Sequence, residues 1–209
     1  MKKTFNSRKE KAAETRNKIY ISAEQLFNEH GFEAVNVDDI VKHAGVAKGS
    51  FYVHFESKDV LIVTFISDYV KKVDTDYKTY LESLPSDMPP HEVFLSLVGK
   101  IADVITESIG CENMRLLYKI QLGKDNKTNA LIDYNRELYK MLYDVISRGM
   151  NQHVFQSAIP TEEIAKHFVM AYRGLTFEWC VRYPDFDLKE QALRHFKILL
   201  TGISSSSKP

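Results

Sequence analysis

The strongest constraint on the fold is a pair of short helical patterns separated by three residues. In residues 37–44 apolar side chains recur at helical spacing, and Gly45 then breaks the pattern. A second pattern follows in residues 48–55, with Phe51 and Phe55 as its apolar pair. Two short helices joined by such a turn and preceded by a longer helix are typical of a helix-turn-helix.

The preceding segment carries its own helix signals. Residues 9–29 fit one helix with a buried stripe, and Gly31 is expected to end it. Asn36 is a good N-cap for the next helix, and Asp39 stands at its third position, where a carboxylate favours a helix start. The stripe of the first helix is predicted to comprise Ile19, Ala23, Leu26, Phe27 and His30. The helix-turn-helix core is predicted to comprise Ile40, Val46, Phe51 and Phe55.

The rest of the chain also predicts helices. The sequence has only nine Gly and six Pro, and long β-branched alternations are absent. Ser57 is expected to cap a long helix that runs to about Leu84, before the prolines at positions 85, 89 and 90. Further helices are expected over about 90–109, 112–122, 126–150, 161–183 and 188–203.

The predicted fold class is therefore all-α. An N-terminal three-helix helix-turn-helix domain would be joined by a long helix to a helical regulatory and dimerisation domain. The predicted boundaries are 1–58 for the DNA-binding domain, with a basic arm at 1–18, 59–203 for the helical ligand-binding and dimerisation domain, and 204–209 for a disordered Ser-rich tail.

Charge is distributed unevenly, although the formal net charge is zero. Residues 1–20 carry seven basic side chains against two acidic ones, a net +5, whereas residues 21–60 carry three against seven, a net −4. Any DNA contact must therefore come from this arm and one selected face of the module that follows. A solvated tail is the alternative interpretation of the arm.

The second short helix offers polar side chains to such a face. A lysine can donate to guanine or phosphate, a serine to either, and tyrosine or histidine to phosphate. Gly49 would allow close approach of the backbone, and Lys58 stands in the first turn of the next helix, where free N–H groups favour a phosphate. The polar residues off the apolar stripe are Lys48, Ser50, Tyr52 and His54.

These residues carry a resemblance to a known family. The runs Gly31-Phe32, Val37-Asp38-Asp39-Ile40 and AGVAKGSFYVHFESK, which ends at Lys58, resemble the signature block of the tetracycline-repressor (TetR) family over about fifty residues. The resemblance implies a homodimer that binds a palindromic operator in double-stranded DNA and is usually released by a small ligand. It places at the DNA Asn36, Lys48, Gly49, Ser50, Tyr52, His54 and Lys58, with Asn36 and Lys58 on phosphates.

One residue departs from the family pattern. Position 47 is Ala, where the pattern often has a Ser or Thr that could cap the recognition helix. Loss of such a cap typically costs about 1 kcal/mol of helix stability. Ala47 can make only an apolar contact, such as one to a thymine methyl group, so the bases recognised stay open.

The last two predicted helices carry wide apolar stripes. Two such helices packed against their copies would form a four-helix dimer interface, a placement that the resemblance supports. Gly174 would permit close helix approach, and Trp179 suits a core or an interface position. The predicted interface residues are Phe168, Tyr172, Leu175, Trp179, Leu193, Phe196 and Leu200.

Aromatic and methionine residues of the middle helices suit a mostly apolar ligand cavity with a few hydroxyl groups. This composition predicts an apolar or aromatic effector, such as a fatty acyl, phenolic or drug-like compound. Ordinary core packing is the alternative for each residue. The predicted pocket residues are Phe94, Met114, Leu117, Tyr118, Tyr134, Leu138, Met141 and Phe177.

The sequence shows no constellation typical of catalysis or metal binding. Its seven His are scattered, and no Gly-rich phosphate loop precedes a helix, so we expect no enzyme, no cofactor and no metal site. Cys111 and Cys180 are too few for a disulfide framework, and we expect reduced thiols. Cys111 follows Gly110 near a predicted helix N-terminus, which leaves a redox-sensing role open beside an incidental one.

The sequence also predicts the cellular location and the function of the protein. No apolar segment follows the charged N-terminus, and the longest apolar stretch, 60–66, is too short to span a bilayer, which predicts a cytoplasmic protein without membrane contact. The predicted function is that of a dimeric, ligand-responsive transcriptional regulator, foremost a repressor. Alternatives are an activator on the same scaffold, a helical protein-interaction module that does not bind DNA, and a small helical enzyme.

Overall fold

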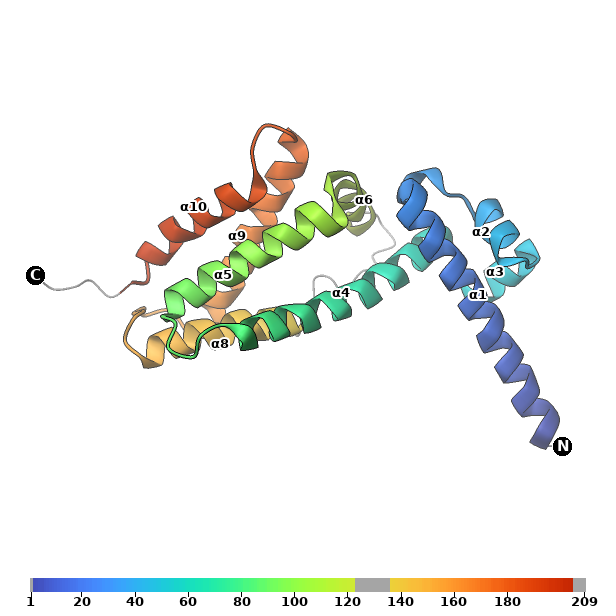
Figure 1. The fold of residues 1–209 in the computed structure, drawn as a ribbon, viewed down its shortest axis with the longest axis horizontal. Coiled ribbons are helices and arrows are strands. Elements are labelled where there is room, and N and C mark those ends of the chain that lie inside the picture. Colours follow the sequence, from blue (N-terminus) through green and yellow to red (C-terminus); the bar gives the residue numbers. More distant parts are fainter. Residues whose placement is uncertain (1, 123–135, 205–209) are drawn as a thin grey trace, which may run out of the picture. The chain divides into compact units, whose positions relative to one another are not determined.

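The computed structural model describes residues 2–122 and 136–204, and every regular element in these two ranges is a helix (Figure 1). The all-α prediction is confirmed. The chain divides into an N-terminal unit, Met1–Tyr69 with Lys119–Thr128, and a C-terminal unit, Val70–Tyr118 with Asn129–Pro209. Two helices, α4 (Lys58–Ser83) and α6 (Cys111–Gln121), contribute residues to both units.

The N-terminal unit begins with α1 (Lys2–Ala34), which starts earlier than the sequence predicted. The backbone of the basic arm is therefore helical from Lys2 onward. Gly31 interrupts α1 with φ 77° and ψ 162°, a conformation that is essentially restricted to glycine, so the predicted break is confirmed. The helices α2 (Val37–Ala44) and α3 (Lys48–His54) follow as the predicted helix-turn-helix, with α2 packed on α1 and α3.

The core of this unit largely follows the predicted stripe. Three members of the α1 stripe are buried, as are three of the four predicted helix-turn-helix anchors, whereas Leu26 and Val46 are half-buried. His30 is exposed, and its prediction as a buried residue is wrong because α1 turns that position toward solvent just before the break. The buried residues of the two sets are Ile19, Ala23, Phe27, Ile40, Phe51 and Phe55.

The C-terminal unit confirms most of the predicted breaks between helices. Gly110 separates η1 from α6, and the connections around 152–160 and 183–187 lie where the sequence placed them. The π-helical turn η1 was not predicted. The proposed helix start at 126 lies outside the described residues, as do positions 205–209 of the predicted tail. The remaining elements are α5 (Pro90–Asp103), η1 (Val104–Ile109), α8 (Glu137–Asn151), α9 (Thr161–Arg182) and α10 (Leu188–Thr201).

An aromatic cluster forms the centre of the C-terminal core. The Phe94 ring centroid lies 4.8 Å from that of Phe168 and 5.8 Å from that of Phe196, and Tyr172 stacks on Phe196 at 5.4 Å. Such aromatic contacts add to the burial of large apolar side chains. The cluster joins α5, α9 and α10, while α8 packs on α5 and α9.

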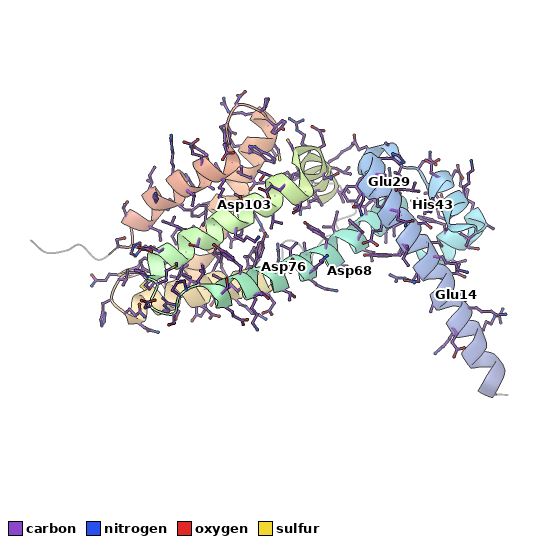
Figure 2. All side chains as sticks on the ribbon, in the orientation of Figure 1. Glu14, Glu29, His43, Asp68, Asp76 and Asp103 are labelled. Atoms are coloured by element: carbon purple, nitrogen blue, oxygen red, sulfur yellow. The ribbon has the colours of Figure 1, made fainter. Side chains whose placement is uncertain are left out.

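Figure 2 labels charged side chains on several of the helices. Glu14 on α1 and Asp76 on α4, both labelled there, are exposed. Among the described helices, none combines the length and the apolar character needed to cross a membrane.

Candidate nucleic-acid interface

The helix-turn-helix begins with a reciprocal cap at α2. The Asn36 side-chain oxygen accepts a hydrogen bond from the Asp39 backbone N–H at 3.0 Å, and the Asp39 carboxylate accepts one from the Asn36 N–H at 3.1 Å. This capping box satisfies two N–H groups that a helix start leaves free, so the predicted cap is confirmed. Asn36 is exposed, which keeps its side-chain amide at the surface.

The turn between α2 and α3 depends on Gly45. This residue has φ 65° and ψ 35°, the left-handed conformation that glycine adopts at little cost. The N–H of Val46 then donates to the Val41 carbonyl at 3.0 Å, which closes the end of α2. The chain therefore turns within three residues and starts α3 at Lys48.

The recognition helix α3 has one buried and one exposed side. Phe51 is 0% exposed, and its ring packs 5.8 Å from that of Phe55. On the other side, Lys48, Gly49 and Tyr52 are exposed, as the sequence predicted for a DNA-facing surface. Ser50 and His54 are half-buried and lie at the margins of that surface.

Val53 is a surface residue that the sequence analysis missed. Its side chain is 78% exposed, although valine is apolar, and it lies one position beyond Tyr52. The signal was present in the spacing, because position 53 follows Gly49 by one helical turn and shares its face. We define the recognition face by its exposed residues, which are Lys48, Gly49, Tyr52 and Val53.

An ion pair holds the first residue of α3. The Lys48 ammonium lies 2.8 Å from one Asp38 carboxylate oxygen and 2.9 Å from the other, and both side chains are exposed. The hydrogen bond that Lys48 donates to Asp38 raises the pKa of Lys48 above its ordinary value, so Lys48 is cationic at neutral pH. Asp38 thereby positions a cation on the recognition face but also competes with any phosphate for it.

The start of α3 has no side-chain cap. Ala47 occupies the N-cap position with extended backbone angles. Its methyl side chain has no acceptor atom, so it makes no capping hydrogen bond. Ala47 is exposed beside Lys48, so its methyl group adds to the apolar part of this surface.

Lys58 has a structural role in this unit. Its ammonium donates to the backbone carbonyl of Phe32 at 2.9 Å and of Val35 at 2.8 Å, with a longer contact to that of Glu33. An ammonium has three donors, and these carbonyls at the end of α1 use them. A phosphate contact by Lys58 stays a prediction, and it would require loss of these bonds.

The basic arm presents cations along α1. Arg8, Lys11 and Arg16 are exposed, and the Arg16 guanidinium lies 5.0 Å from the centroid of the Phe55 ring. This cation–π contact ties the arm to the end of α3 within the N-terminal unit. The helical arm and the recognition face therefore belong to one packed unit.

The predicted dimer residues are mostly inside the C-terminal unit. Phe168, Trp179, Phe196 and Leu200 are buried, while Tyr172, Leu175 and Leu193 are half-buried. The wide stripes of α9 and α10 pack against the aromatic cluster and α5, and the dimer interface stays a prediction. Sequence periodicity identified the apolar side of each helix but not which part of it stays exposed.

A narrower apolar stripe is exposed on α9. Phe177 is 45% exposed and Val181 62% exposed, and Met170 lies on the same side. The stripe passes Gly174, beside which a Cβ atom would meet nothing within 4 Å. We call Met170, Gly174, Phe177 and Val181 the α9 stripe; their spacing of four, three and four residues places them on one helix face.

The predicted pocket residues have several environments. Phe94 belongs to the aromatic cluster, whereas Phe177 is on the α9 stripe and packs edge-on against Tyr118 at 5.3 Å. Leu117, Leu138 and Met141 are buried and Met114 half-buried, while Tyr134 lies outside the described residues. The shared effector pocket stays a prediction.

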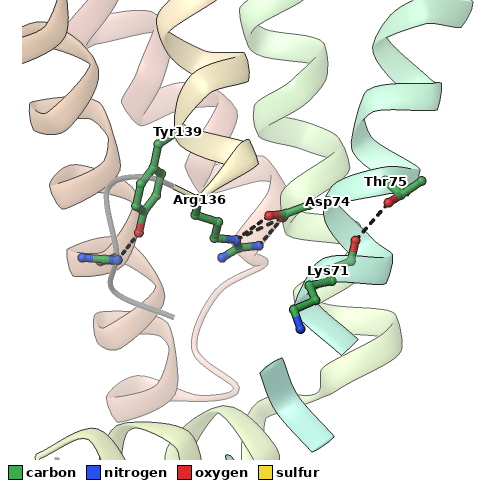
Figure 3. Close-up of polar contacts among 6 residues, drawn as sticks. Lys71, Asp74, Thr75, Arg136 and Tyr139 are labelled. Carbon is green, nitrogen blue, oxygen red and sulfur yellow. Dashed lines mark hydrogen bonds and ion pairs between the residues drawn. The ribbon is translucent and has the colours of Figure 1, made fainter. Parts of the chain in front are cut away.

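A buried ion pair joins α4 to the start of α8 (Figure 3). The Arg136 guanidinium donates to both carboxylate oxygens of Asp74, with distances from 2.6 to 3.0 Å, and Asp74 is only 5% exposed. One helical turn further on, the Tyr139 hydroxyl accepts a hydrogen bond from the Arg173 guanidinium of α9. No local sequence pattern predicts these polar contacts, because their partners lie far apart in the chain.

In this unit a tight turn joins two helices. The second helix is anchored by aromatic side chains on one side and exposed on the other, an arrangement typical of helix-turn-helix DNA-binding regulators. Residues 19–64 match the family described as bacterial regulatory proteins, tetR family. The helix-turn-helix part of the chain therefore matches the DNA-binding region of the tetR family of bacterial regulatory proteins.

Relatives and solved structures agree with this assignment. The chain is 26% identical over 202 residues to the transcriptional regulator AcrR of Shigella flexneri, covering 92% of this chain and 90% of that one. It is 27% identical over 181 residues to the regulator YerO of Bacillus subtilis, covering 75% of this chain but only 62% of the relative. The fold is similar to that of Thermus thermophilus FadR, with a TM-score of 0.71, 19% identity and coverage of 93% and 98%.

Proposed function

We propose that the chain is a dimeric repressor that binds a palindromic operator through the recognition face and is released by a small apolar or aromatic effector. The observation that carries the proposal is the exposure of Lys48, Gly49, Tyr52 and Val53 on a helix whose opposite side is anchored by Phe51. A recognition helix needs this division between a fixed core side and a free DNA side.

Phosphate binding would come from several cations and donors of the N-terminal unit. Arg8, Lys11 and Arg16 lie exposed on α1, and Tyr52 offers a hydroxyl on α3. Asn36 offers a side-chain amide at the start of α2. Such contacts position a protein on DNA without recognising bases, and they make affinity fall with salt.

Base recognition would come from Lys48 together with apolar side chains. Lys48 can donate to guanine O6 and N7, while Ala47 and Val53 can contact thymine methyl groups. We expect a Val53→Ser protein to lose preference for thymine at one operator position, at a cost of about 1 kcal/mol. Selection of binding sites from random duplexes by both proteins measures this; unchanged preferences would remove Val53 from base recognition.

Dimerisation would use the α9 stripe. Contiguous exposed apolar residues mark interaction surfaces, and Gly174 would let a second α9 approach closely. A two-fold dimer would present two recognition helices about 34–36 Å apart, one turn of DNA. We expect Phe177→Glu and Val181→Glu to give monomers in sedimentation velocity, whereas the exposed control Lys197→Glu stays dimeric.

Release would follow from the differential affinity of the effector for two arrangements of the dimer. The T. thermophilus FadR structure is of a transcriptional repressor in complex with lauroyl-CoA, which supports an acyl or similar apolar effector for this fold. Thermal-shift measurements with fatty acyl, phenolic and drug-like compounds should show stabilisation. Stabilisation by charged sugars or nucleotides alone would contradict the effector class.

The experiment that tests the proposal is a fluorescence-anisotropy titration with DNA flanking the chain's own gene. We expect sequence-preferring binding that weakens steeply between about 50 and 200 mM salt. Absence of binding at low salt would overturn the proposal. Reporter expression in a deletion strain should rise for a repressor and fall for an activator.

A further inference from the structure

Cys111 and Cys180 are the two cysteines of the chain, and the candidate interface uses neither. Both are buried, one at the first position of α6 and the other near the end of α9. The two side chains lie near enough across these helices for each to influence the pKa of the other. Two nucleophilic sulfur atoms therefore lie near each other inside the C-terminal unit.

Two hydrogen bonds beside the cysteines join α6 to α9, and we call this contact the α6–α9 seam. The Arg115 side chain donates to the Cys180 carbonyl at 2.8 Å, and the Tyr118 hydroxyl donates to the Arg173 carbonyl at 3.2 Å. Positions 111, 115 and 118 share one face of α6 because they are four and three residues apart. Contacts that advance along α6 move backward along α9, so the two helices run antiparallel here and place both cysteines at the same end of the α6–α9 seam.

The environment keeps both thiols protonated at rest. Burial raises the pKa of Cys111, and Arg115 acts in the opposite direction. Burial also raises the pKa of Cys180, to about 12, and the adjacent Cys111 adds to this effect. Cys111 stands at the N-terminus of α6, where free N–H groups favour a thiolate, so it is the better nucleophile of the pair.

We propose that Cys111 and Cys180 form a redox modification site, at which a hydroperoxide converts the thiol pair reversibly into a disulfide that joins α6 to α9. The site goes beyond the proposed function and does not depend on it. A disulfide requires a sulfur–sulfur distance of about 2.05 Å. Formation of this bond requires the two neighbouring side chains to move toward each other.

The reaction balances in two steps. The Cys111 thiolate attacks one peroxide oxygen and breaks the O–O bond, which gives a sulfenic acid, while the other oxygen leaves with a proton. The Cys180 sulfur then attacks the Cys111 sulfur, the S–S bond forms, and the S–O bond breaks with loss of water. Two thiols thereby supply the two electrons that reduce one hydrogen peroxide to two waters, and an external dithiol reverses the change.

Treatment of the full chain with graded hydrogen peroxide tests the proposal by intact-mass spectrometry. We expect a mass loss of about 2 Da and loss of both alkylatable thiols, with full recovery in dithiothreitol. Peptide mapping should identify one cross-linked peptide containing positions 111 and 180. The melting temperature of the oxidised chain should rise by several degrees, because the bond restricts the unfolded state.

The single variants Cys111→Ser and Cys180→Ser are the matched controls. Each retains one thiol, so each should gain about 16 Da or a multiple of it and form no internal disulfide. Disulfide-linked dimers or oxygen addition alone in the wild-type chain would overturn the proposal. Retention of both thiols under conditions in which the urea-unfolded chain is oxidised would also overturn it.

Discussion

The two units differ in how far apart in the sequence their important partners lie. In the N-terminal unit, the cap at Asn36, the turn at Gly45 and the recognition face all fall within residues 36–54. In the C-terminal unit, Asp74 pairs with Arg136, and the α6–α9 seam joins residues more than fifty positions apart. Local signals therefore specify the first unit, and long-range packing specifies the surfaces of the second.

This difference explains which predictions held. A capping residue or a glycine in the left-handed region acts on its own neighbourhood, so its effect can be derived from a short window of sequence. Which side of an amphipathic helix remains exposed depends on how many neighbours cover it. For α9 these neighbours cover Phe168 and Trp179 but leave Phe177 and Val181 at the surface.

The largest expected effect is that of Phe51→Ala. Removal of this fully buried ring should cost about 3–5 kcal/mol of the free energy of unfolding. Hydrogen–deuterium exchange should show loss of protection in α1–α3 and retention in α5 and α10. Val53→Ala, two positions away but exposed, should change stability by less than about 0.5 kcal/mol. Equal loss of protection in both units would contradict their separation.

Asp74→Asn should have the next largest effect, in the other unit. It leaves the Arg136 guanidinium with an uncompensated charge in a mostly buried site, which should cost about 3 kcal/mol. Urea denaturation measures the loss. Asp76→Asn on the same helix is the control, because Asp76 is exposed (Figure 2). A similar small effect for both variants would show that the buried ion pair does not stabilise the C-terminal unit.

Alkaline pH should reduce the stability of the C-terminal unit. The pKa of Cys180 is raised to about 12 by burial, and burial also raises the pKa of Tyr118 and Tyr172. A raised pKa favours the neutral group in the folded state, so stability is full below about pH 9 and falls as pH rises toward 12. Melting temperatures from pH 7.5 to 11 measure the decline. Cys180→Ser should make it shallower, and an unchanged slope would contradict the contribution of this thiol.

Ala47→Ser should have the smallest effect, a gain of stability in the N-terminal unit. A serine hydroxyl at the N-cap of α3 can accept a backbone hydrogen bond that alanine cannot, which is worth about 0.5–1 kcal/mol. Denaturant midpoints of the two proteins measure the gain. A loss of stability would show that α3 needs no side-chain cap in this turn.

Particular residues show how far the sequence alone could go. The helix-turn-helix, its cap and the polar part of the recognition face followed from spacing and residue type. Val53 was missed because an apolar residue in a short helix suggests core. The carbonyl contacts of Lys58 and the Asp38–Lys48 pair could not be derived, since they depend on how the ends of three helices meet.

The central claim is that the recognition face binds DNA through a cation held by Asp38. Anisotropy titrations of one selected duplex with wild-type, Lys48→Ala and Asp38→Asn proteins test it most directly, with Lys197→Ala as the control. Lys48→Ala should weaken binding about tenfold, and Asp38→Asn should strengthen it up to about fivefold by releasing Lys48 and removing a negative charge. Unchanged affinity for both variants, at a salt concentration where the wild type binds, would contradict the account.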